Sequence, residues 1–205
     1  MHTYLALGDS YTIGEGISLH QGYPYQTIQF LRAAGHEFAA PEIIARTGWT
    51  TDELSHALTT VRLLPAYDFV TLLIGVNNQY RGRDASEYAA QFGALLHKAI
   101  HLTGTPAKVF VLSIPDWGYS PFAATRDKNL ISGEIDAFNA VAEQITQQQK
   151  VHFIDITTHS RTEGATPESF VADGLHPASA TYRAWAQHVA DAINAGLPNR
   201  MLHVD

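Results

Sequence analysis

Short apolar runs of strand length alternate along the chain with longer segments whose apolar positions recur at helical spacing. The pattern predicts five strands, at residues 3–7, 42–45, 69–74, 108–114 and 151–156. Helices are predicted at residues 25–34, 131–149 and 178–195, and in the segments that begin at Thr50 and Asp84. Strands that alternate with helices indicate βαβ units, whose strands are parallel and whose crossovers are right-handed.

This alternation predicts an α/β fold built on a parallel sheet. Residues 69–74 form a continuous apolar run, which is typical of a parallel strand buried on both faces. A five-stranded parallel sheet most often has the flavodoxin-like strand order 2-1-3-4-5. Because no linker, repeat or low-complexity stretch divides the sequence, we expect one domain over residues 1–205.

Local signals mark the ends of three predicted helices. Thr50 and Glu53 have the spacing of a capping box before one helix, and Asp84 and Glu87 have capping spacing before another. Gly35 follows the first predicted helix, and we expect it to close that helix as a C-cap.

The composition narrows the class of protein. The chain has no cysteine, which excludes a disulfide scaffold, thiolate zinc sites and thiol catalysis. Its formal net charge of -7 disfavours nucleic acid as a partner, because phosphate neutralisation needs clustered Lys and Arg. No apolar run approaches the ~20 residues that span a bilayer. Since the first residues also lack the basic start of a signal peptide, we expect a cytoplasmic protein, with a trimmed secreted form left open.

The segments that follow the predicted strands are polar and rich in glycine, in contrast to the strands themselves. They cover residues 8–16, 46–49, 75–80, 115–119 and 173–177. Ligands of open parallel sheets bind outside the carboxyl ends of the strands, near the point where the strand order reverses. The chemistry of the protein is therefore expected in these segments.

Several of these segments hold the groups that ester hydrolysis needs, namely a nucleophile, an oriented base and donors for the oxyanion. Ser10 lies at a strand-to-helix turn and is the expected nucleophile. His176 is the expected base, and Asp173 is close enough in sequence to accept a hydrogen bond from its Nδ1. The expected oxyanion donors are the backbone N–H groups of Ser10 and Gly48 and the side-chain amide of Asn77.

These motifs resemble the four sequence blocks of the SGNH hydrolase (GDSL esterase) family, over residues 7–178. The nucleophile block reads Gly-Asp-Ser-Tyr, with Tyr11 where the family has leucine. Gly48 matches the glycine block, and residues 173–177 match the Asp-x-x-His-Pro block without deviation. The remaining block, Gly-x-Asn-Asp in the family, has Asn78 in place of its aspartate.

The resemblance implies a flavodoxin-like three-layer α/β/α sandwich with the chemistry of a serine esterase. The enzyme would hydrolyse small carboxylic esters through an acyl-enzyme, with no cofactor and no metal. Ser10, His176 and Asp173 would form the triad, and Ser10, Gly48 and Asn77 the oxyanion hole. The change at Asn78 affects the hydrogen bonds behind the oxyanion loop, because an amide replaces a carboxylate.

Aromatic and polar residues after the strand ends are candidates for substrate binding. We expect contacts from Trp49, Asn78, Tyr80 and Trp117, while Tyr119 and Phe122 also follow strand ends. Arg81 and Arg83 are close enough in sequence to Asn77 to meet an anionic or sugar-rich leaving group, but we expect them to be solvated.

Two other classes of protein remain open from the sequence. Ser10, Thr12 and Gly14 also suit the phosphate loop of a flavodoxin-like protein that binds phosphate or flavin. The same fold would also suit a binding module without catalytic activity. His97 and His101 have the spacing of metal ligands on a helix, but no third ligand accompanies them, so we expect no metal site.

Overall fold

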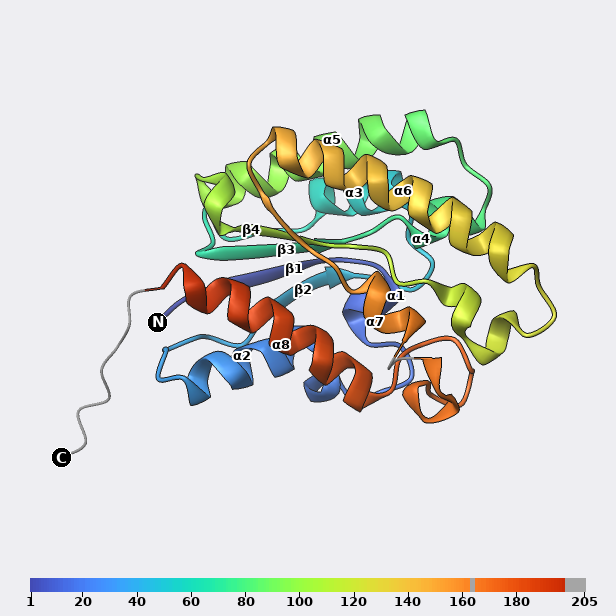
Figure 1. Ribbon diagram of the computed structural model, residues 1–205. Helices are drawn as coiled ribbons and strands as arrows, with labels where there is room; N and C mark the ends of the chain where they lie inside the picture. The colour runs from blue at the N-terminus through green and yellow to red at the C-terminus, as the bar shows by residue number, and fades with distance from the viewer. Residues whose placement is uncertain (163–164, 198–205) are drawn as a thin grey trace.

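A sheet of five parallel strands forms the centre of the computed structural model, which describes residues 1–162 and 165–197 (Figure 1). The strands are β1 (Tyr4–Gly8), β2 (Glu42–Ala45), β3 (Phe69–Leu73), β4 (Val109–Leu112) and β5 (His152–Ile154). Their spatial order is β2-β1-β3-β4-β5, and every neighbouring pair is parallel. The predicted α/β class and strand order are thus confirmed.

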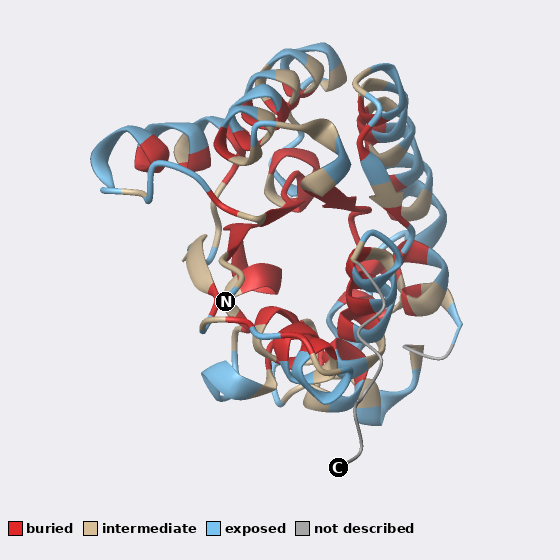
Figure 2. Ribbon diagram, turned by 90° about the vertical axis from the view of Figure 1, so that its left-hand side faces the viewer, coloured by how far each residue is buried: buried red, intermediate tan, exposed pale blue. Residues whose placement is uncertain are grey.

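Helices cover both faces of the sheet and complete an α/β/α sandwich. On one face lie α2 (Tyr23–Ala33) and α8 (Ser179–Ala195), and on the other α3 (Thr51–Thr60), α5 (Ala85–Thr103) and α6 (Lys128–Gln148) (Figure 1). Buried residues occupy the central strands β1, β3 and β4 and the helix sides that face the sheet, and exposed residues occupy the outer sides of the helices (Figure 2). This arrangement explains the continuous apolar character of β3, all of whose residues are buried.

Short helices lie near the carboxyl end of the sheet. They are α1 (Ser10–Ile13), α4 (Val76–Tyr80) and α7 (Thr157–Arg161), together with the 3₁₀ turns Leu19–Gln21, Trp117–Tyr119, Pro121–Ala123 and Pro167–Ser169. A further 3₁₀ turn, Pro106–Lys108, precedes β4 at the opposite end of the sheet. The sequence pattern does not predict α4 or α7, because about one turn of helix is too short to show a 3.6-residue period.

Capping groups set the helix ends. The Thr50–Glu53 capping box is present, and the Asp84 side chain accepts hydrogen bonds from the N–H groups of Ser86 and Glu87, as the sequence indicates. Helix α6 begins three residues earlier than predicted, because Asp127 caps it through the N–H groups of Asn129 and Leu130.

At the end of α2, the cap is Ala34 rather than the predicted Gly35. Gly35 follows it with a φ of 89°, the left-handed conformation that glycine adopts without strain.

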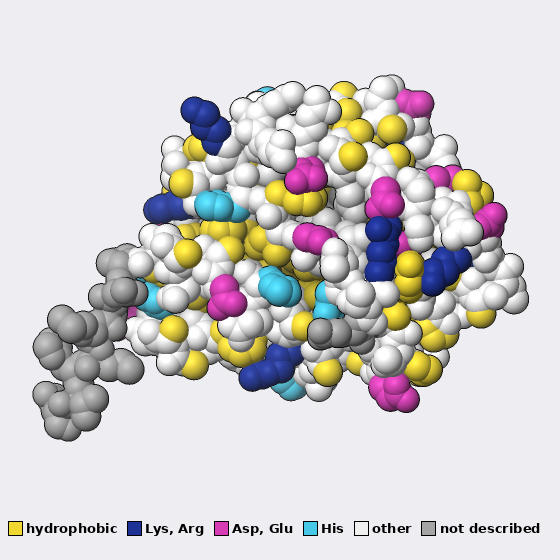
Figure 3. Space-filling view, viewed as in Figure 1, with side chains coloured by type: hydrophobic (Ala, Val, Ile, Leu, Met, Phe, Trp, Pro, Cys, Tyr) yellow, Lys and Arg dark blue, Asp and Glu magenta, His cyan; other side chains and the backbone are white. Residues whose placement is uncertain are grey.

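Charged side chains of both signs are dispersed over the face shown in Figure 3. Lys and Arg do not gather there into a single basic patch. Among residues 1–162 and 165–197, none of the helices combines the length and the apolar character required to cross a membrane.

Candidate active site

A cavity of about 210 Å³ lies at the carboxyl end of the sheet, where the loops after several strands meet. It contains Ser10, Gly48, Asn77 and His176 among its walls, so residues predicted from four separate segments come together in one place. The complete lining is Ser10, Tyr11, Thr47, Gly48, Val76, Asn77, Tyr80, Trp117, Phe122, Leu175 and His176.

Ser10 is the first residue of α1, directly after β1. Gly8 ends the strand where no side chain fits, because a Cβ there would lie 2.3 Å from the Leu73 carbonyl oxygen and 2.1 Å from Thr12 Oγ1. Asp9 then caps α1 by accepting a hydrogen bond from the Tyr11 N–H at 3.0 Å. As the first helical residue, Ser10 has an N–H without an acceptor inside the helix, and this group is free to bind an anion.

The Asp9 carboxyl group is buried beside the nucleophile position. Its Oδ1 accepts from Tyr11, whereas its Oδ2 has no hydrogen-bond partner within the described part of the chain. Burial raises the pKa of Asp9 to about 7, although the hydrogen bonds from the backbone lower it in part. This carboxyl group supports α1 and does not line the cavity.

His176 and Asp173 form a hydrogen-bonded pair on the opposite wall. Nδ1 of His176 lies 2.6 Å from Asp173 Oδ2, and Asp173 Oδ1 accepts from the backbone N–H groups of Leu175 at 2.8 Å and His176 at 2.9 Å. A tight turn at Gly174, with a φ of 69°, brings the two side chains together. Since Nδ1 is engaged by Asp173, Nε2 is the nitrogen left for a reactant.

The environment of Asp173 favours its ionised form. Partial burial raises its pKa, but the hydrogen bonds from the His176 ring and from the backbone N–H groups of His176 and Leu175 outweigh that effect. The net result is a pKa below the ordinary value of an aspartate. An ionised Asp173 stabilises positive charge on His176 when that ring accepts a proton.

Ser10 and His176 face the same cavity without a hydrogen bond between them. Within residues 1–162 and 165–197 the Ser10 hydroxyl has no hydrogen-bond partner, and no partner occupies His176 Nε2. Contacts between nucleophile and base are commonly long in unliganded enzymes and shorten when substrate binds. The Tyr11 ring packs against the imidazole, with 5.6 Å between ring centroids, and supports its position.

Gly48 presents its backbone N–H on the cavity wall. Its φ of 83° is a left-handed conformation that L side chains rarely adopt, which accounts for glycine at this position. No hydrogen bond of the described chain uses this N–H. The carbonyl of the same residue accepts from Arg81 Nη2 at 2.6 Å, so the orientation of Gly48 is fixed while its donor stays open.

Asn77 lies in α4, immediately after β3. Gly75 makes the sharp turn between the two, with a φ of 133°, and a Cβ on it would approach the Tyr88 ring to 2.7 Å. Asn77 Nδ2 donates to the Trp49 carbonyl at 3.0 Å. Because a side-chain amide carries two N–H groups, the second is available to a ligand in the cavity.

The predicted substrate-binding residues divide into two groups. Tyr80 and Trp117 line the cavity, whereas Trp49 and Asn78 do not. Asn78 is fully buried, with Oδ1 accepting from the Thr51 N–H at 3.1 Å and Nδ2 donating to Thr51 Oγ1 at 2.7 Å. It therefore ties α4 to the start of α3, and its burial keeps it from a substrate in the cavity.

Trp49 lies outside the cavity for a different reason. Its side chain borders a separate surface hollow beside α3, together with Arg46 and His56. Only its backbone carbonyl serves the site, by accepting the hydrogen bond from Asn77.

Other cavity-lining residues were missed by the sequence reasoning or named only in general terms. Phe122 lines the cavity and Tyr119 does not, and Tyr11, Thr47, Val76 and Leu175 were not predicted. Tyr11 and Leu175 are direct neighbours of predicted catalytic residues, so adjacency to Ser10 and His176 was an available signal.

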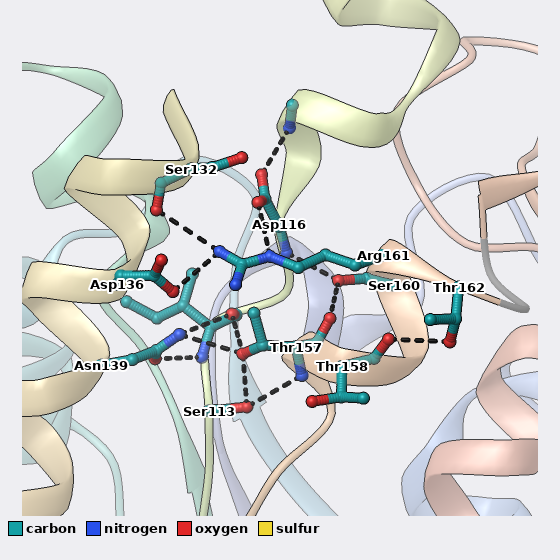
Figure 4. Close-up of polar contacts among 12 residues, drawn as sticks. Ser113, Asp116, Ser132, Asp136, Asn139, Thr157, Thr158, Ser160, Arg161 and Thr162 are labelled. Atoms are coloured by element: carbon teal, nitrogen blue, oxygen red, sulfur yellow. Dashed lines mark hydrogen bonds and ion pairs between the residues drawn. The ribbon is translucent and has the colours of Figure 1, made fainter. Parts of the chain in front are cut away.

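A network of polar side chains behind Trp117 fixes the loop after β4 (Figure 4). The Asp116 side chain, which is 0% exposed, accepts from Arg161 Nε at 2.8 Å and from the Gly118 N–H at 2.9 Å. Arg161 also pairs with Asp136 on α6 at 2.8 Å. The Asp116 N–H in turn donates to Ser160 Oγ at 2.8 Å, so α7 and α6 together hold the turn that presents Trp117.

The histidines His97 and His101 are both exposed on α5. In the part of the chain that the structure describes, no group of three or more His, Asp or Glu side chains is arranged to hold a metal ion.

Solved structures share this fold at low sequence identity. A protein called TesA superposes with a TM-score of 0.76 at 21% identity, covering 95% of this chain and 99% of that one. A lipase/acylhydrolase from Enterococcus faecalis gives a TM-score of 0.78 at 20% identity, with 98% and 100% covered. Axe2, an acetylxylan esterase from Geobacillus stearothermophilus, gives 0.73 at 18% identity, with 98% and 97% covered.

The comparison with curated proteins gives no significant match. A family model, by contrast, matches residues 6–184, a range that includes all the predicted catalytic residues. The chain belongs to the GDSL-like lipase/acylhydrolase family.

Proposed function

We propose that this protein is a serine esterase that hydrolyses small carboxylic esters through an acyl-enzyme intermediate. The observation that carries the proposal is the cavity itself. Ser10, Gly48, Asn77 and His176, whose ring is hydrogen-bonded to Asp173, come from separate segments of the chain and line one small space, which supports these roles. Membership of the family supports the same chemistry.

In the first half of the reaction, Ser10 Oγ attacks the ester carbonyl carbon while His176 Nε2 accepts its proton. The carbonyl oxygen becomes an oxyanion, which accepts hydrogen bonds from the N–H groups of Ser10 and Gly48 and from Asn77 Nδ2. When the tetrahedral intermediate collapses, His176 returns the proton to the leaving alcohol oxygen. The acyl group then remains on Ser10.

In the second half, water replaces the alcohol. His176 Nε2 accepts a proton from the water as its oxygen attacks the acyl carbon, and the same donors hold the second oxyanion. Collapse of this intermediate releases the carboxylic acid and returns the proton to Ser10. Asp173 remains ionised throughout and stabilises the imidazolium that forms in each half.

The shape of the cavity indicates the size of the substrate. A volume of about 210 Å³ lies below the roughly 300–1,000 Å³ of pockets that enclose drug-sized ligands. Its walls include the rings of Tyr80, Trp117 and Phe122, which suit an apolar group. We infer a short acyl chain, with the alcohol portion extending toward solvent.

The test is hydrolysis of p-nitrophenyl acetate, butyrate and longer esters, combined with covalent labelling by a fluorophosphonate. The wild-type protein should favour the shorter esters and gain the mass of one phosphonyl group at Ser10. Ser10→Ala should lose both properties while keeping its far-UV circular dichroism and melting temperature. Ser55→Ala, which changes an exposed serine on α3, serves as the matched control and should behave as wild type. Substantial turnover by purified Ser10→Ala would refute the proposal.

A further inference from the structure

One arginine lies over the aromatic wall of the cavity and has no acidic partner among the described residues. Arg126 belongs to the exposed segment between the Pro121–Ala123 turn and α6. Its guanidinium carbon lies 5.3 Å from each of the ring centroids of Tyr80, Trp117 and Phe122. These three rings line the cavity, so the cation is located at the cavity rim.

The hydrogen-bonding capacity of Arg126 is almost unused. Within the described part of the chain, its one hydrogen bond is from Nη2 to the Tyr80 hydroxyl, at 3.2 Å. Among residues 1–162 and 165–197, no carboxylate lies within ion-pair distance of it. Since a guanidinium carries five N–H groups, most of its donors are left to solvent or to a ligand.

The other arginines near the site differ in this respect. Arg81 pairs with Glu53 and donates to the Gly48 carbonyl, and Arg83 pairs with Asp52 and Glu87. Arg161 pairs with Asp116 and Asp136. The two arginines that the sequence offered for an anionic leaving group therefore pair with carboxylates, whereas Arg126 pairs with none among the described residues.

The aromatic rings fix the cation without consuming its donors. Attraction between a guanidinium and the faces of aromatic rings holds the group in place and uses none of its N–H bonds. The planar fork of an arginine matches the two oxygens of a carboxylate. The rim of the apolar cavity thus holds a positioned guanidinium that can bind one carboxylate.

We propose that Arg126 selects ester substrates that carry a second, free carboxylate, by binding that carboxylate at the cavity rim. The inference rests on the proposed esterase function and narrows its substrate class. It places the free carboxylate away from the scissile bond, which lies at Ser10, and it makes Arg126 a specificity-determining residue.

The neighbouring Lys128 provides a matched control. Its Nζ lies 3.2 Å from the centroid of the Tyr119 ring, so it also contacts an aromatic face. Tyr119 does not line the cavity. Lys128→Gln therefore removes the same charge two residues away, at the start of α6, without touching the rim.

The experiment compares pairs of esters that differ in a free carboxylate. One pair, 4-acetoxybenzoate and its methyl ester, carries the difference on the leaving group. The other, mono-4-nitrophenyl glutarate and 4-nitrophenyl pentanoate, carries it on the acyl group. For at least one pair, Arg126→Gln should lower the ratio of kcat/KM for the charged ester to that for the neutral ester about tenfold. The loss should appear mainly in KM, and Arg126→Lys should retain part of the preference.

Lys128→Gln should leave these ratios unchanged. The inference would be overturned if Arg126→Gln left the ratio unchanged for both pairs. It would also be overturned if the wild-type protein hydrolysed only the neutral esters. In either case the esterase proposal would stand.

Binding to a variant that cannot turn over the ester separates failure of the carboxylate site from failure of the proposed esterase function. Calorimetric titration of 4-acetoxybenzoate and of mono-4-nitrophenyl glutarate into Ser10→Ala should, for at least one of them, give a dissociation constant about tenfold lower than titration into the Ser10→Ala, Arg126→Gln double variant. Equal affinities of the two proteins for both compounds would overturn the anion site. If binding differs as expected but wild-type protein hydrolyses no ester, the esterase proposal fails and the carboxylate site remains.

Discussion

Polar side chains gather in two places at the carboxyl end of the sheet, and the two clusters differ in how far the protein satisfies them. In the cluster around Arg161, between β4, β5, α6 and α7, nearly every group has partners (Figure 4). Ser113 Oγ accepts from the N–H groups of Ile156 at 2.9 Å and Thr157 at 3.0 Å. The Asn139 side chain bonds both the N–H and the carbonyl of Ile114, at 2.7 and 3.0 Å.

In the cavity proposed as the active site the corresponding groups are open. The Gly48 N–H, the Ser10 hydroxyl and His176 Nε2 have no partner among the described residues, and the walls around them are largely apolar. Polarity at the end of a parallel sheet therefore does not by itself identify a site. A cluster whose hydrogen bonds are complete holds loops in place, whereas unpaired donors facing a cavity are available to a reactant.

Two asparagines test this difference most directly, because each stands in one of the clusters. Asn77→Ala removes an oxyanion donor and should lower kcat by about 10²–10³, with little change in KM, since the bond strengthens mainly in the transition state. Asn139→Ala should keep most of kcat and lower the free energy of unfolding by about 1–3 kcal/mol, because it leaves buried backbone groups unpaired. Steady-state kinetics and urea unfolding measure both effects. A loss in KM alone for Asn77→Ala would contradict its oxyanion role.

The ion pair of Arg161 gives a second test, which concerns stability. Arg161→Gln leaves the buried Asp116 carboxylate with the Gly118 N–H but without its charged partner. We expect a loss of about 2–3 kcal/mol of unfolding free energy, below the ~3–5 kcal/mol of a fully buried pair because Arg161 is partly exposed. Arg83→Gln, in an exposed ion pair, should cost about 0.5 kcal/mol or less. Equal shifts in the urea midpoints of the two variants would contradict the structural role of the Arg161 cluster.

How much the sequence could predict depends on how local each signal is. Ser10 and the Asp173–His176 pair were predictable, because strand-end position and a three-residue spacing define them. Arg126 was not, because its position over the cavity depends on packing between α4 and the loop after β4. Asn78 was expected at the substrate, but the turn at Gly75 places Asn77 at the cavity and directs the next side chain to Thr51.

The pH dependence of the rate should reflect one group of the catalytic pair. Because hydrogen bonds hold the pKa of Asp173 below its ordinary value, its carboxylate stays ionised until the pH falls through that lowered value. Within this pair, the acidic limb then reflects the imidazole alone, whose protonated form cannot accept the Ser10 proton. We expect kcat/KM to fall about tenfold per pH unit on the acidic limb.

The control for this profile is near-UV circular dichroism over the same range. The stabilisation from the Asp173 carboxylate is complete above the unfolded-state pKa and is lost only below it, so activity should fall before the fold is lost. A kcat/KM profile that is flat from about pH 5 to 9 would exclude a histidine base.

The smallest change in activity is expected at Asn78, which adjoins the oxyanion donor but lies behind the cavity wall. In Asn78→Asp, Oδ1 can still accept from the Thr51 N–H, and the Thr51 hydroxyl can donate to the second carboxylate oxygen if it gives up its hydrogen bond to Gln91 Oε1. The substitution also restores the residue that the family usually carries. The variant should therefore keep most of its kcat, with a loss of about 1 kcal/mol of stability from burying the charge. Asn78→Ala, which leaves the Thr51 N–H unpaired, should be less stable than Asn78→Asp. If Asn78→Asp lost as much kcat as Asn77→Ala, Asn78 would have to be counted among the groups that act in the reaction and not among those that support them.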